Sequence, residues 1–543
     1  MPVLNVLFPK LSPGLWLLLS AGLALRGTIA YFLPPGFDEA YYFLYTRNLD
    51  WSYFDHPAAV AVSTGAGVWI TGIASPFTIR LGALGLYTLS LWLLYGTSLW
   101  LFGQRAAGIT LVVASFSPLF MLTFGTLAAP DNPLIFFWTL AVALAAQEFF
   151  PPASRSPTDR SPAERTAYLE YRPTARIAVI GVVIGLCCLS KYHGCLLGLS
   201  LLGFCLSSPR YRCALRSQWF ALGLALCGIM LLPIFIWNAE HNWISFQFQL
   251  SDRFDGQARS YSFLQVLGSF AAGIGFLFPT FGLPLWFTSL HAAWSQLSIR
   301  HSTRPLTHDK VKWVLWVGLP VAAGFTLLSG LIHTYPAWPA PGLWSLTLLL
   351  GHRAATWPIK AIWRWLSSTG VIVVLLLFAL SHVTLGTLQN PSQYAIAGGI
   401  LPPAQDPSTE LIDTRQLQSA LEQSEAFRTA TSQIGFLLTH EFWLSGYVAM
   451  SLPPSEQTLP VATFSEDPRG HAIWDTPAQW LGQDAVFVSL SDFPQTEVLA
   501  AIAPYFQSVT ELTQIQLRRG EAVIKTLYLY KAKQLLQAYP YPY

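Results

Sequence analysis

The sequence predicts a mainly α-helical membrane protein, a polytopic bundle of about 11 spans, followed by a small α/β domain that lies in water. The chain has 543 residues, of which 53% are hydrophobic and only 11% are charged. Soluble domains carry about 25% charged residues. The deficit of charge is confined to the part before about residue 390. The chain therefore divides into a large membrane part and a smaller part of ordinary composition.

Apolar runs of about 17–25 residues are long enough to cross a bilayer as helices. The first run holds Arg26 and lacks an Ala-x-Ala cleavage signal, so we expect it to be retained as a signal anchor. A short Gly-rich stretch at 57–73 is expected to lie in the interface or to dip into the membrane. The expected spans are 14–33, 78–102, 106–127, 132–149, 176–190, 194–207, 217–236, 263–290, 313–330, 338–351 and 367–388.

Lysine and arginine set the expected orientation, because cytoplasmic loops carry most of these residues. Placing the N-terminus inside gives the inner loops roughly three times as many of them as the outer loops. This orientation predicts a membrane domain at 1–388, with a first outer loop at 34–62 and a cytoplasmic insert at 150–176. A linker at 389–409 and an extracytoplasmic α/β domain at 410–543 follow. The expected outer-loop cations are Arg47, Arg80, Lys191, Arg253 and Arg259.

The last part of the chain alternates helical and strand patterns. Residues 414–430 can place Leu417, Leu421 and Phe427 on one face of a helix, and 499–505 is also expected to be helical. Strands are expected at 485–490 and 524–530. The six cysteines all lie in or beside apolar segments and lack metal-ligand spacing, so we interpret them as packing residues. The net charge of +3 and the lack of a long basic run argue against nucleic acid as a partner.

The first outer loop concentrates charge beside the membrane. Charged side chains there are costly unless they face water, a metal or a substrate. Asp38 can cap a helix that starts here, with Glu39 complementing the helix dipole, or it can accept a proton from an acceptor group. Asp55 and His56 precede Pro57, so they can form a turn, or they can bind a metal ion or a phosphate.

Three other outer junctions carry candidate residues. Asp131 can cap the next helix or converge on Asp38. Lys191 can neutralise a phosphate or extend to the lipid headgroups. His241 is a candidate ligand between tryptophans that are typical interface anchors. Arg253 and Arg259 can meet an anionic substrate. No Walker loop and no GxGxxG motif after a strand is present.

Several of these segments together resemble a known family. The order and spacing of the motifs from about residue 14 to residue 345 resemble the bacterial glycosyltransferase family 39 proteins. These proteins belong to the GT-C superfamily, whose members include protein O-mannosyltransferases and aminoarabinose-lipid A transferases. The segments that carry the resemblance are 37–42 (FDEAYY), 53–57 (YFDHP), 129–133 (APDNP), 189–192 (LSKY), 236–238 (IWN), 243–249 (WISFQFQ), 470–474 (GHAIW), 483–487 (QDAVF), 517–520 (LRRG) and 527–530 (LYLY).

The resemblance implies a GT-C helical bundle that moves a hexosyl or pentosyl group from a polyprenyl-phosphate carrier to a lipid, glycan or protein at the outer face. Asp38 matches the family's catalytic acidic residue, and Glu39 is its motif neighbour. The positions implied to bind the donor phosphate or lipid are Lys191, Arg47, Tyr41, Tyr42, Tyr192, Arg253 and Arg259. Asp55, His56 and His241 are implied to bind phosphate or a divalent metal ion, and Asp131 is implied to support the site.

One position departs from the family pattern. Tyr335 stands where relatives commonly have a lysine, and His333 is a possible substitute. Two alternatives stay open at this stage. A lipid or sugar transporter or flippase is disfavoured, because no inverted repeat relates the halves of the membrane part. A glycan polymerase or ligase of the same fold is not distinguished by the sequence.

Overall fold

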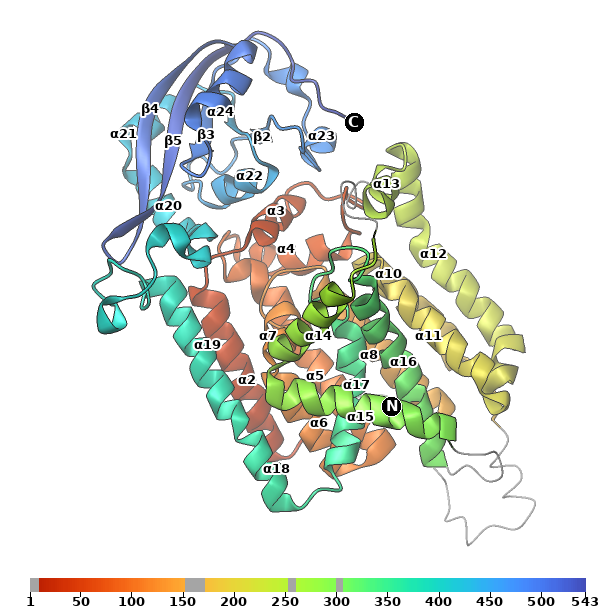
Figure 1. The fold of residues 1–543 in the computed structure, drawn as a ribbon. Helices are drawn as coiled ribbons and strands as arrows, with labels where there is room; N and C mark the ends of the chain where they lie inside the picture. The colour runs from red at the N-terminus through yellow and green to blue at the C-terminus, as the bar shows by residue number, and fades with distance from the viewer. Residues whose placement is uncertain (1–8, 152–170, 252–259, 299–305) are drawn as a thin grey trace, which may run out of the picture.

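The computed structural model describes residues 9–151, 171–251, 260–298 and 306–543. Most of the expected cytoplasmic insert, together with Arg253 and Arg259, lies outside the described residues. A helical body formed by the N-terminal two thirds of the chain carries a smaller α/β body at one end (Figure 1).

The helical body contains both long and short helices. Among the described residues, six helices are long and apolar enough to cross a membrane: Pro13–Phe32, Thr78–Phe102, Asp131–Phe149, Gln218–Glu240, Leu306–Leu328 and Ile359–Leu385. In order, its elements are α2 (Pro13–Phe32), α3 (Phe37–Tyr45), α4 (Ala59–Thr71), η1 (Thr78–Arg80), α5 (Leu81–Phe102), α6 (Gln104–Phe116), α7 (Pro118–Thr123), α8 (Asp131–Phe149), α10 (Arg176–Ser190), α11 (Gly194–Ser207), η3 (Pro209–Arg216), α12 (Gln218–Glu240), α13 (Ile244–Leu250), α14 (Phe263–Leu277), α15 (Pro279–Ser298), α16 (Leu306–Leu328), α17 (Ala340–Ala354), α18 (Ile359–Leu366) and α19 (Ser368–Leu385).

Two of the expected spans are interrupted by proline. The run expected at 263–290 ends at Leu277 and restarts at Pro279, with Phe278 at a φ of 72° between the two helices. The run expected at 106–127 ends at Phe116, and α7 starts at Pro118. Proline lacks an N–H and moves the preceding residue away from helical angles, so each helix stops before it. These two predictions of continuous spans were therefore wrong.

The smaller body contains a mixed sheet. Its strands are β1 (Phe436–Thr439), β2 (Val461–Thr463), β3 (Ala485–Leu490), β4 (Phe506–Arg519) and β5 (Ala522–Leu535), in the order β2-β1-β3-β5-β4. β1 pairs in parallel with β2 and β3, whereas β5 pairs antiparallel with β3 and β4. Its other elements are η5 (Ile396–Gly398), η6 (Pro403–Gln405), η7 (Pro407–Glu410), α20 (Thr414–Gln423), α21 (Glu425–Thr431), α22 (Phe442–Met450), α23 (His471–Trp474), η8 (Pro477–Trp480), α24 (Gln495–Ile502) and η9 (Ala503–Tyr505).

The sequence predicted part of the secondary structure of this body. β3 has the expected bounds, and the strand expected at 524–530 lies inside β5. The single helix expected at 414–430 is two helices, because Ser424 accepts a hydrogen bond from the N–H of Phe427 and starts α21 there. The helix expected at 499–505 begins earlier, at Gln495, and ends at Ile502.

One hydrophobic core joins the two bodies across α3. The buried residues of α3 belong to the same cluster as Leu444, Tyr447 and Val486 of the smaller body. The Tyr447 hydroxyl donates a hydrogen bond of 2.7 Å to the carbonyl oxygen of Pro35. At Gly446, a Cβ atom would overlap the carbonyl oxygen of Ala40. α22 and α3 therefore touch backbone to backbone, and the first outer loop lies between the bodies (Figure 1).

Replacing Gly446 by alanine is expected to destabilise the protein, because the carbonyl of Ala40 cannot move as a flexible side chain would. We expect a loss of about 1–3 kcal/mol in the free energy of unfolding. The matched control is Gly370→Ala in α19, where a Cβ atom meets no heavy atom within 4 Å. Thermal unfolding in detergent measures both variants. Equal melting temperatures would contradict the close packing of α22 on α3.

Candidate active site

A buried ion pair holds the first outer loop to the membrane helices. Arg80 donates from Nε to Glu39 Oε1 at 2.7 Å and from Nη2 to Glu39 Oε2 at 2.6 Å. The same guanidinium donates to the carbonyl oxygens of Ala30, Leu33 and Pro34 at 2.6–3.1 Å. Both side chains are almost completely excluded from solvent. Arg80 therefore ties the end of α2 and the start of α3 to the beginning of α5.

Glu39 also completes the start of α3. Its Oε2 accepts a hydrogen bond of 2.9 Å from the N–H of Gly36, which is the N-cap residue. Its Oε1 accepts a further hydrogen bond of 2.7 Å from the N–H of Ala128. The alternative of Asp38 as the N-cap was wrong, because Gly36 occupies that position and the Glu39 side chain accepts from its N–H, as the N3 residue of a capping box does. Both oxygens of Glu39 are bonded in this way, so the side chain holds the start of α3; the catalytic role expected for Glu39 together with Asp38 stays a prediction.

Asp38 differs from its neighbour in exposure. It lies in the first turn of α3 and is exposed, whereas Glu39 is buried. The positive end of the helix dipole favours a carboxylate at this position. Asp38 is close enough to Tyr42 to raise the pKa of that buried hydroxyl. α3 thus presents one carboxylate outward while its neighbour anchors the helix.

Asp55 is buried and paired across the two bodies. The Tyr45 hydroxyl donates a hydrogen bond to Asp55 Oδ1, and Arg469 Nη1 donates to Asp55 Oδ2 at 3.3 Å. Gln249 of α13 holds the backbone of the same residue, with Nε2 donating to the Asp55 carbonyl oxygen at 2.7 Å. The sequence allowed either a turn or a ligand here. In the structure, the carboxylate makes an ion pair with the smaller body.

Buried tyrosines surround this carboxylate. Tyr45 stacks on Tyr53 with ring centroids 3.8 Å apart, and the Tyr41 hydroxyl accepts a hydrogen bond of 3.0 Å from the N–H of Gly470. Burial raises the pKa of Tyr41, Tyr42 and Tyr45 well above the usual value, and the charge of Asp55 raises all three further. The hydroxyls therefore stay protonated, so they act as neutral hydrogen-bonding groups.

Lys191 and Asp131 form a second buried ion pair. Lys191 Nζ donates to Asp131 Oδ1 at 2.9 Å and to Oδ2 at 2.8 Å. Asp131 starts α8, and Lys191 follows α10 directly. Burial raises the pKa of Tyr42 most, and the charges of Asp38, Asp55 and Asp131 raise it further. Asp131 is not the cap of α8, because Pro130 is the N-cap residue. Convergence of Asp131 on Asp38 stays a prediction, and Lys191 is buried among protein groups.

Other predicted residues lie around this centre. The Tyr192 hydroxyl shares a hydrogen bond of 2.8 Å with Ser245 Oγ, which donates to the Phe54 carbonyl oxygen at 2.8 Å. The exposed Arg47 donates to the carbonyl oxygen of Ala449 at 3.4 Å.

Three other predicted positions make contacts between aromatic rings. His56 packs edge-on against Tyr42 with ring centroids 5.5 Å apart. His241 stacks on Trp237 at 4.2 Å, and its Nδ1 lies 2.7 Å from the Trp237 carbonyl oxygen. Tyr335 is half exposed and packs edge-on against His333.

The donors present do not fit a divalent metal ion. Within the part of the chain that the structure describes, no three His, Cys, Asp or Glu side chains gather in a way that could hold one. Asp55 is bonded to Tyr45 and Arg469, while His241 lies against its own helix. The interpretation of Asp55, His56 and His241 as a metal site therefore has no support in this geometry.

Sequence reasoning missed two arginines. Arg80 was counted only for membrane orientation, although a lone arginine near an acidic loop is a possible partner for it. Arg469 directly precedes the 470–474 motif, which was the available signal. The pair that Arg469 forms with Asp55 joins residues 414 positions apart, which no local spacing reveals.

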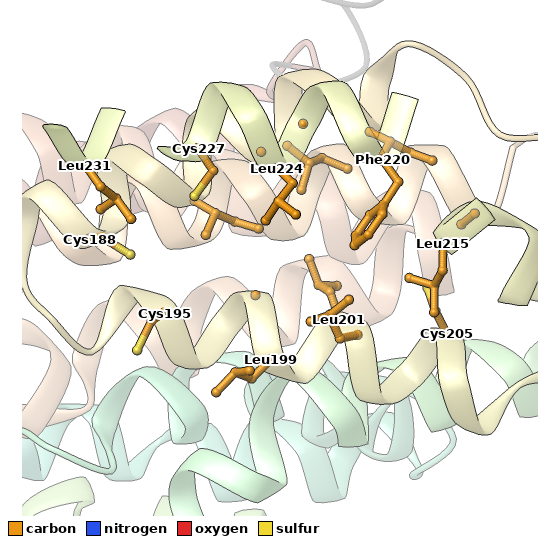
Figure 2. A pocket seen from close by; sticks show the side chains of 18 of the residues that line it. Cys188, Cys195, Leu199, Leu201, Cys205, Leu215, Phe220, Leu224, Cys227 and Leu231 are labelled. Carbon is orange, nitrogen blue, oxygen red and sulfur yellow. The ribbon is translucent and has the colours of Figure 1, made fainter. Parts of the chain in front are cut away.

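An apolar groove opens between α10, α11 and α12 (Figure 2). Its volume is about 310 Å³, and apolar side chains line it almost completely. Four cysteines contribute to the lining, Cys188, Cys195, Cys205 and Cys227. Of the lining residues, Cys188 lies near the end of α10 that Lys191 follows.

Comparison with known proteins identifies relatives. Residues 55–148 match the family model described as dolichyl-phosphate-mannose-protein mannosyltransferase. The chain is 25% identical over 338 residues to the lipid A galacturonosyltransferase RgtD of Rhizobium johnstonii. That match covers 60% of this chain and spans 61% of the length of the relative.

The fold has solved counterparts. ArnT from Cupriavidus metallidurans in the apo state superposes with a TM-score of 0.56 at 15% identity, covering 95% of this chain and 97% of ArnT. Its structure bound to undecaprenyl phosphate gives a TM-score of 0.55 at 16% identity and covers 95% and 98%. These likenesses agree with the predicted resemblance: one segment matches the mannosyltransferase family model, part of the chain is similar to a lipid A galacturonosyltransferase, and the chain shares the fold of ArnT.

Glu39→Gln is expected to cost about 3–5 kcal/mol of stability, because it leaves the buried charge of Arg80 without its counter-ion. Chemical unfolding of the purified protein measures this loss. The neighbouring substitution Asp38→Asn is the matched control and should change stability by less than about 0.5 kcal/mol, since that side chain is exposed. A Glu39→Gln protein as stable as the parent would contradict the anchoring role.

Proposed function

We propose that this chain is a membrane glycosyltransferase that moves a sugar from a polyprenyl-phosphate carrier to an acceptor at the outer face of the bacterial inner membrane. One observation carries the proposal: α3 exposes Asp38 while Glu39, Arg80 and the buried tyrosines fix the helix beneath it. The relation to ArnT, one structure of which contains undecaprenyl phosphate, supports a lipid-linked donor.

Asp38 is assigned as the general base. It takes the proton from the hydroxyl or amine of the acceptor as that atom bonds to the anomeric carbon of the sugar, and the bond between the sugar and the carrier phosphate breaks. The leaving phosphate is already acidic, so it needs neutralisation of charge more than a proton donor. A site with one exposed carboxylate and nearby cations fits this need.

Lys191 is assigned to the carrier phosphate. Asp131 holds its ammonium group through two oxygens, which fixes the group in place at the end of α10. An ammonium group has three N–H donors, so a carrier phosphate can accept a hydrogen bond from Nζ in addition to Asp131. Tyr42 lies near the same groups and offers a neutral hydroxyl. Arg47, Arg253 and Arg259 remain proposed partners for the anionic donor, and no step requires a metal ion.

The apolar groove is assigned to the isoprenoid chain. It includes Cys188, near the end of α10 that Lys191 follows, and runs along α10, α11 and α12, which all belong to the apolar helical body. A lipid whose phosphate meets Lys191 can extend its first units into this groove and leave the rest in the bilayer. Burial of apolar groups there contributes to binding.

The proposed topology follows the charge bias. The N-terminus lies inside, and the site and the domain at 410–543 lie outside. The domain joins the membrane domain, 1–388, through the linker 389–409. The likeness to glycosyltransferases supports transfer over transport, and the acceptor can be a lipid, a glycan or a protein. To identify the acceptor, mass spectrometry compares lipids, glycans and proteins from a deletion strain and its parent. The class that lacks one sugar mass in the deletion strain contains the acceptor.

Asp38→Asn is expected to lower the transfer rate by about 10²–10⁴-fold, the usual contribution of a general base. The assay follows radiolabelled sugar from a synthetic polyprenyl-phosphate donor to the acceptor fraction. Glu410→Gln removes another exposed carboxylate, in η7, and should leave the rate unchanged. Full activity of a folded Asp38→Asn protein would refute the assignment.

Gly198→Leu is expected to fill the groove and to raise the KM for a long-chain donor about 5- to 20-fold, which corresponds to about 1–2 kcal/mol of lost binding. The nearest atoms to a Cβ at Gly198 belong to Ile184 at 3.5 Å, so the helix itself tolerates the change.

Gly228→Leu is the matched control, because Gly228 is an exposed residue of α12 outside the groove. A donor with only two isoprene units should be insensitive to both substitutions. An unchanged KM for the long-chain donor in Gly198→Leu would place the isoprenoid chain elsewhere.

A further inference from the structure

Arg469 adopts a backbone conformation that a residue with a side chain rarely takes. Its φ is +46°, in the left-handed region that favours glycine. Such residues persist only where the surroundings hold them, and they concentrate at functional sites. The backbone of Arg469 therefore indicates that contacts of this residue hold it in place.

The guanidinium of Arg469 connects the smaller body to the first outer loop. Nη1 donates to Asp55 Oδ2 and Nε donates to Asp467 Oδ2, each at 3.3 Å. The group lies over the ring of Phe442 at 3.9 Å and near the ring of Phe248 at 5.5 Å. These contacts come from α22, from α13 and from the loop that follows α3. One side chain thus joins three segments, one of which directly follows α3, the helix that carries Asp38.

The electrostatic surroundings agree with this placement. Burial lowers the pKa of Arg469, but the neighbouring charges of Asp55, Asp467 and Asp38 outweigh it and raise the pKa above its usual value. The guanidinium is therefore a permanent cation. It faces the paired carboxylate of Asp55 and is within electrostatic reach of the proposed base.

A chain of hydrogen bonds braces the segment that carries Arg469. Ser445 Oγ lies 2.8 Å from His471 Nε2, and His471 Nδ1 lies 2.8 Å from Asp475 Oδ2. This order is that of a hydrolase triad. However, Ser445 is completely buried and its hydroxyl also lies 2.5 Å from the Phe442 carbonyl oxygen, so no substrate reaches it. The triad-like chain fixes α23 on α22.

The other side of Arg469 is fixed as well. The N–H of Gly470 donates to the Tyr41 hydroxyl of α3 at 3.0 Å. The Tyr541 hydroxyl donates to Asp475 Oδ2 at 3.3 Å and to the Thr463 carbonyl oxygen at 3.0 Å. The strained turn at 469 is therefore held from the sheet and from α3 at once.

We propose that Arg469 is a positioning residue of the active site that the smaller body contributes, and that it acts through Asp55 to hold the segment 50–57 against α3, the helix that carries Asp38. This inference rests on the proposed function and extends it. The C-terminal domain is then part of the reaction site as well as a neighbour of it. Removal of Arg469 leaves Asp55 Oδ2 without its ion-pair partner and weakens the hold on the loop at 50–57, while Tyr45, Gln249 and Asp38 itself remain.

The test uses Arg469→Gly, which removes the side chain and also fits the left-handed backbone. We expect kcat to fall about 100-fold, because small displacements of a reacting geometry have effects of this size. Added methylguanidine should restore part of kcat in this variant. Arg415→Ala is the matched control: Arg415 also links the bodies, through the Tyr31 carbonyl oxygen at 2.7 Å, but it does not contact Asp55. Its kcat should stay within about twofold.

A double-mutant cycle with Asp55→Asn tests the route of action. If Arg469 acts through Asp55, the double variant should be no slower than the slower single variant. The proposal would be overturned if the decrease in kcat of the double variant equals the product of the decreases in the two single variants. It would also be overturned if kcat of Arg469→Gly stays within twofold of the parent. Should Arg469→Gly fail to fold, Arg469→Lys takes its place in the cycle under the same criteria.

Hydrogen exchange separates this inference from the proposed function. Amide exchange at 46–57 should rise in Arg469→Gly and remain at the parent level in Arg415→Ala, whether or not the parent transfers sugar. A parent without transfer but with this exchange pattern would refute the glycosyltransferase proposal alone. Unchanged exchange in Arg469→Gly would refute the positioning role alone.

Discussion

The ion pair between Arg80 and Glu39 is the interaction on which the rest of the site depends. It joins the carbonyl oxygens at the end of α2, the cap of α3 and the N–H of Ala128 in one buried network. A buried charge without its partner is costly, so each of these segments is held to the others. The network fixes the direction of α3, and that direction decides which carboxylate of the Asp38–Glu39 pair faces outward.

α3 also carries the second body of the protein. Its buried face shares a core with α22 and the sheet, and Gly446 allows the two backbones to touch. The outer loop then closes over this junction through the ion pair of Asp55 with Arg469. The helical body thus carries the proposed base and the proposed groove for the lipid, while the smaller body supplies a cation that reaches the loop. Neither body alone forms the complete proposed reaction site.

Composition and motifs predicted the class of fold, the order of the apolar helices and the strand at 485–490, because these depend on local patterns. They also selected Asp38, Asp131 and Lys191, but only the structure shows that Asp131 and Lys191 pair. The breaks before Pro118 and Pro279 were overlooked, since hydropathy averages over a proline. Arg80 and Arg469 were missed because their partners lie 41 and 414 residues away.

The central claim is that the chain splits the bond between sugar and carrier phosphate and passes the sugar to an acceptor. The most direct measurement places the purified protein in lipid vesicles with a donor labelled in both the sugar and the polyprenyl chain. The account predicts that labelled acceptor and free polyprenyl phosphate appear in equal amounts without nucleotide sugar. Movement of the intact donor across the bilayer, with both labels still joined, would contradict it.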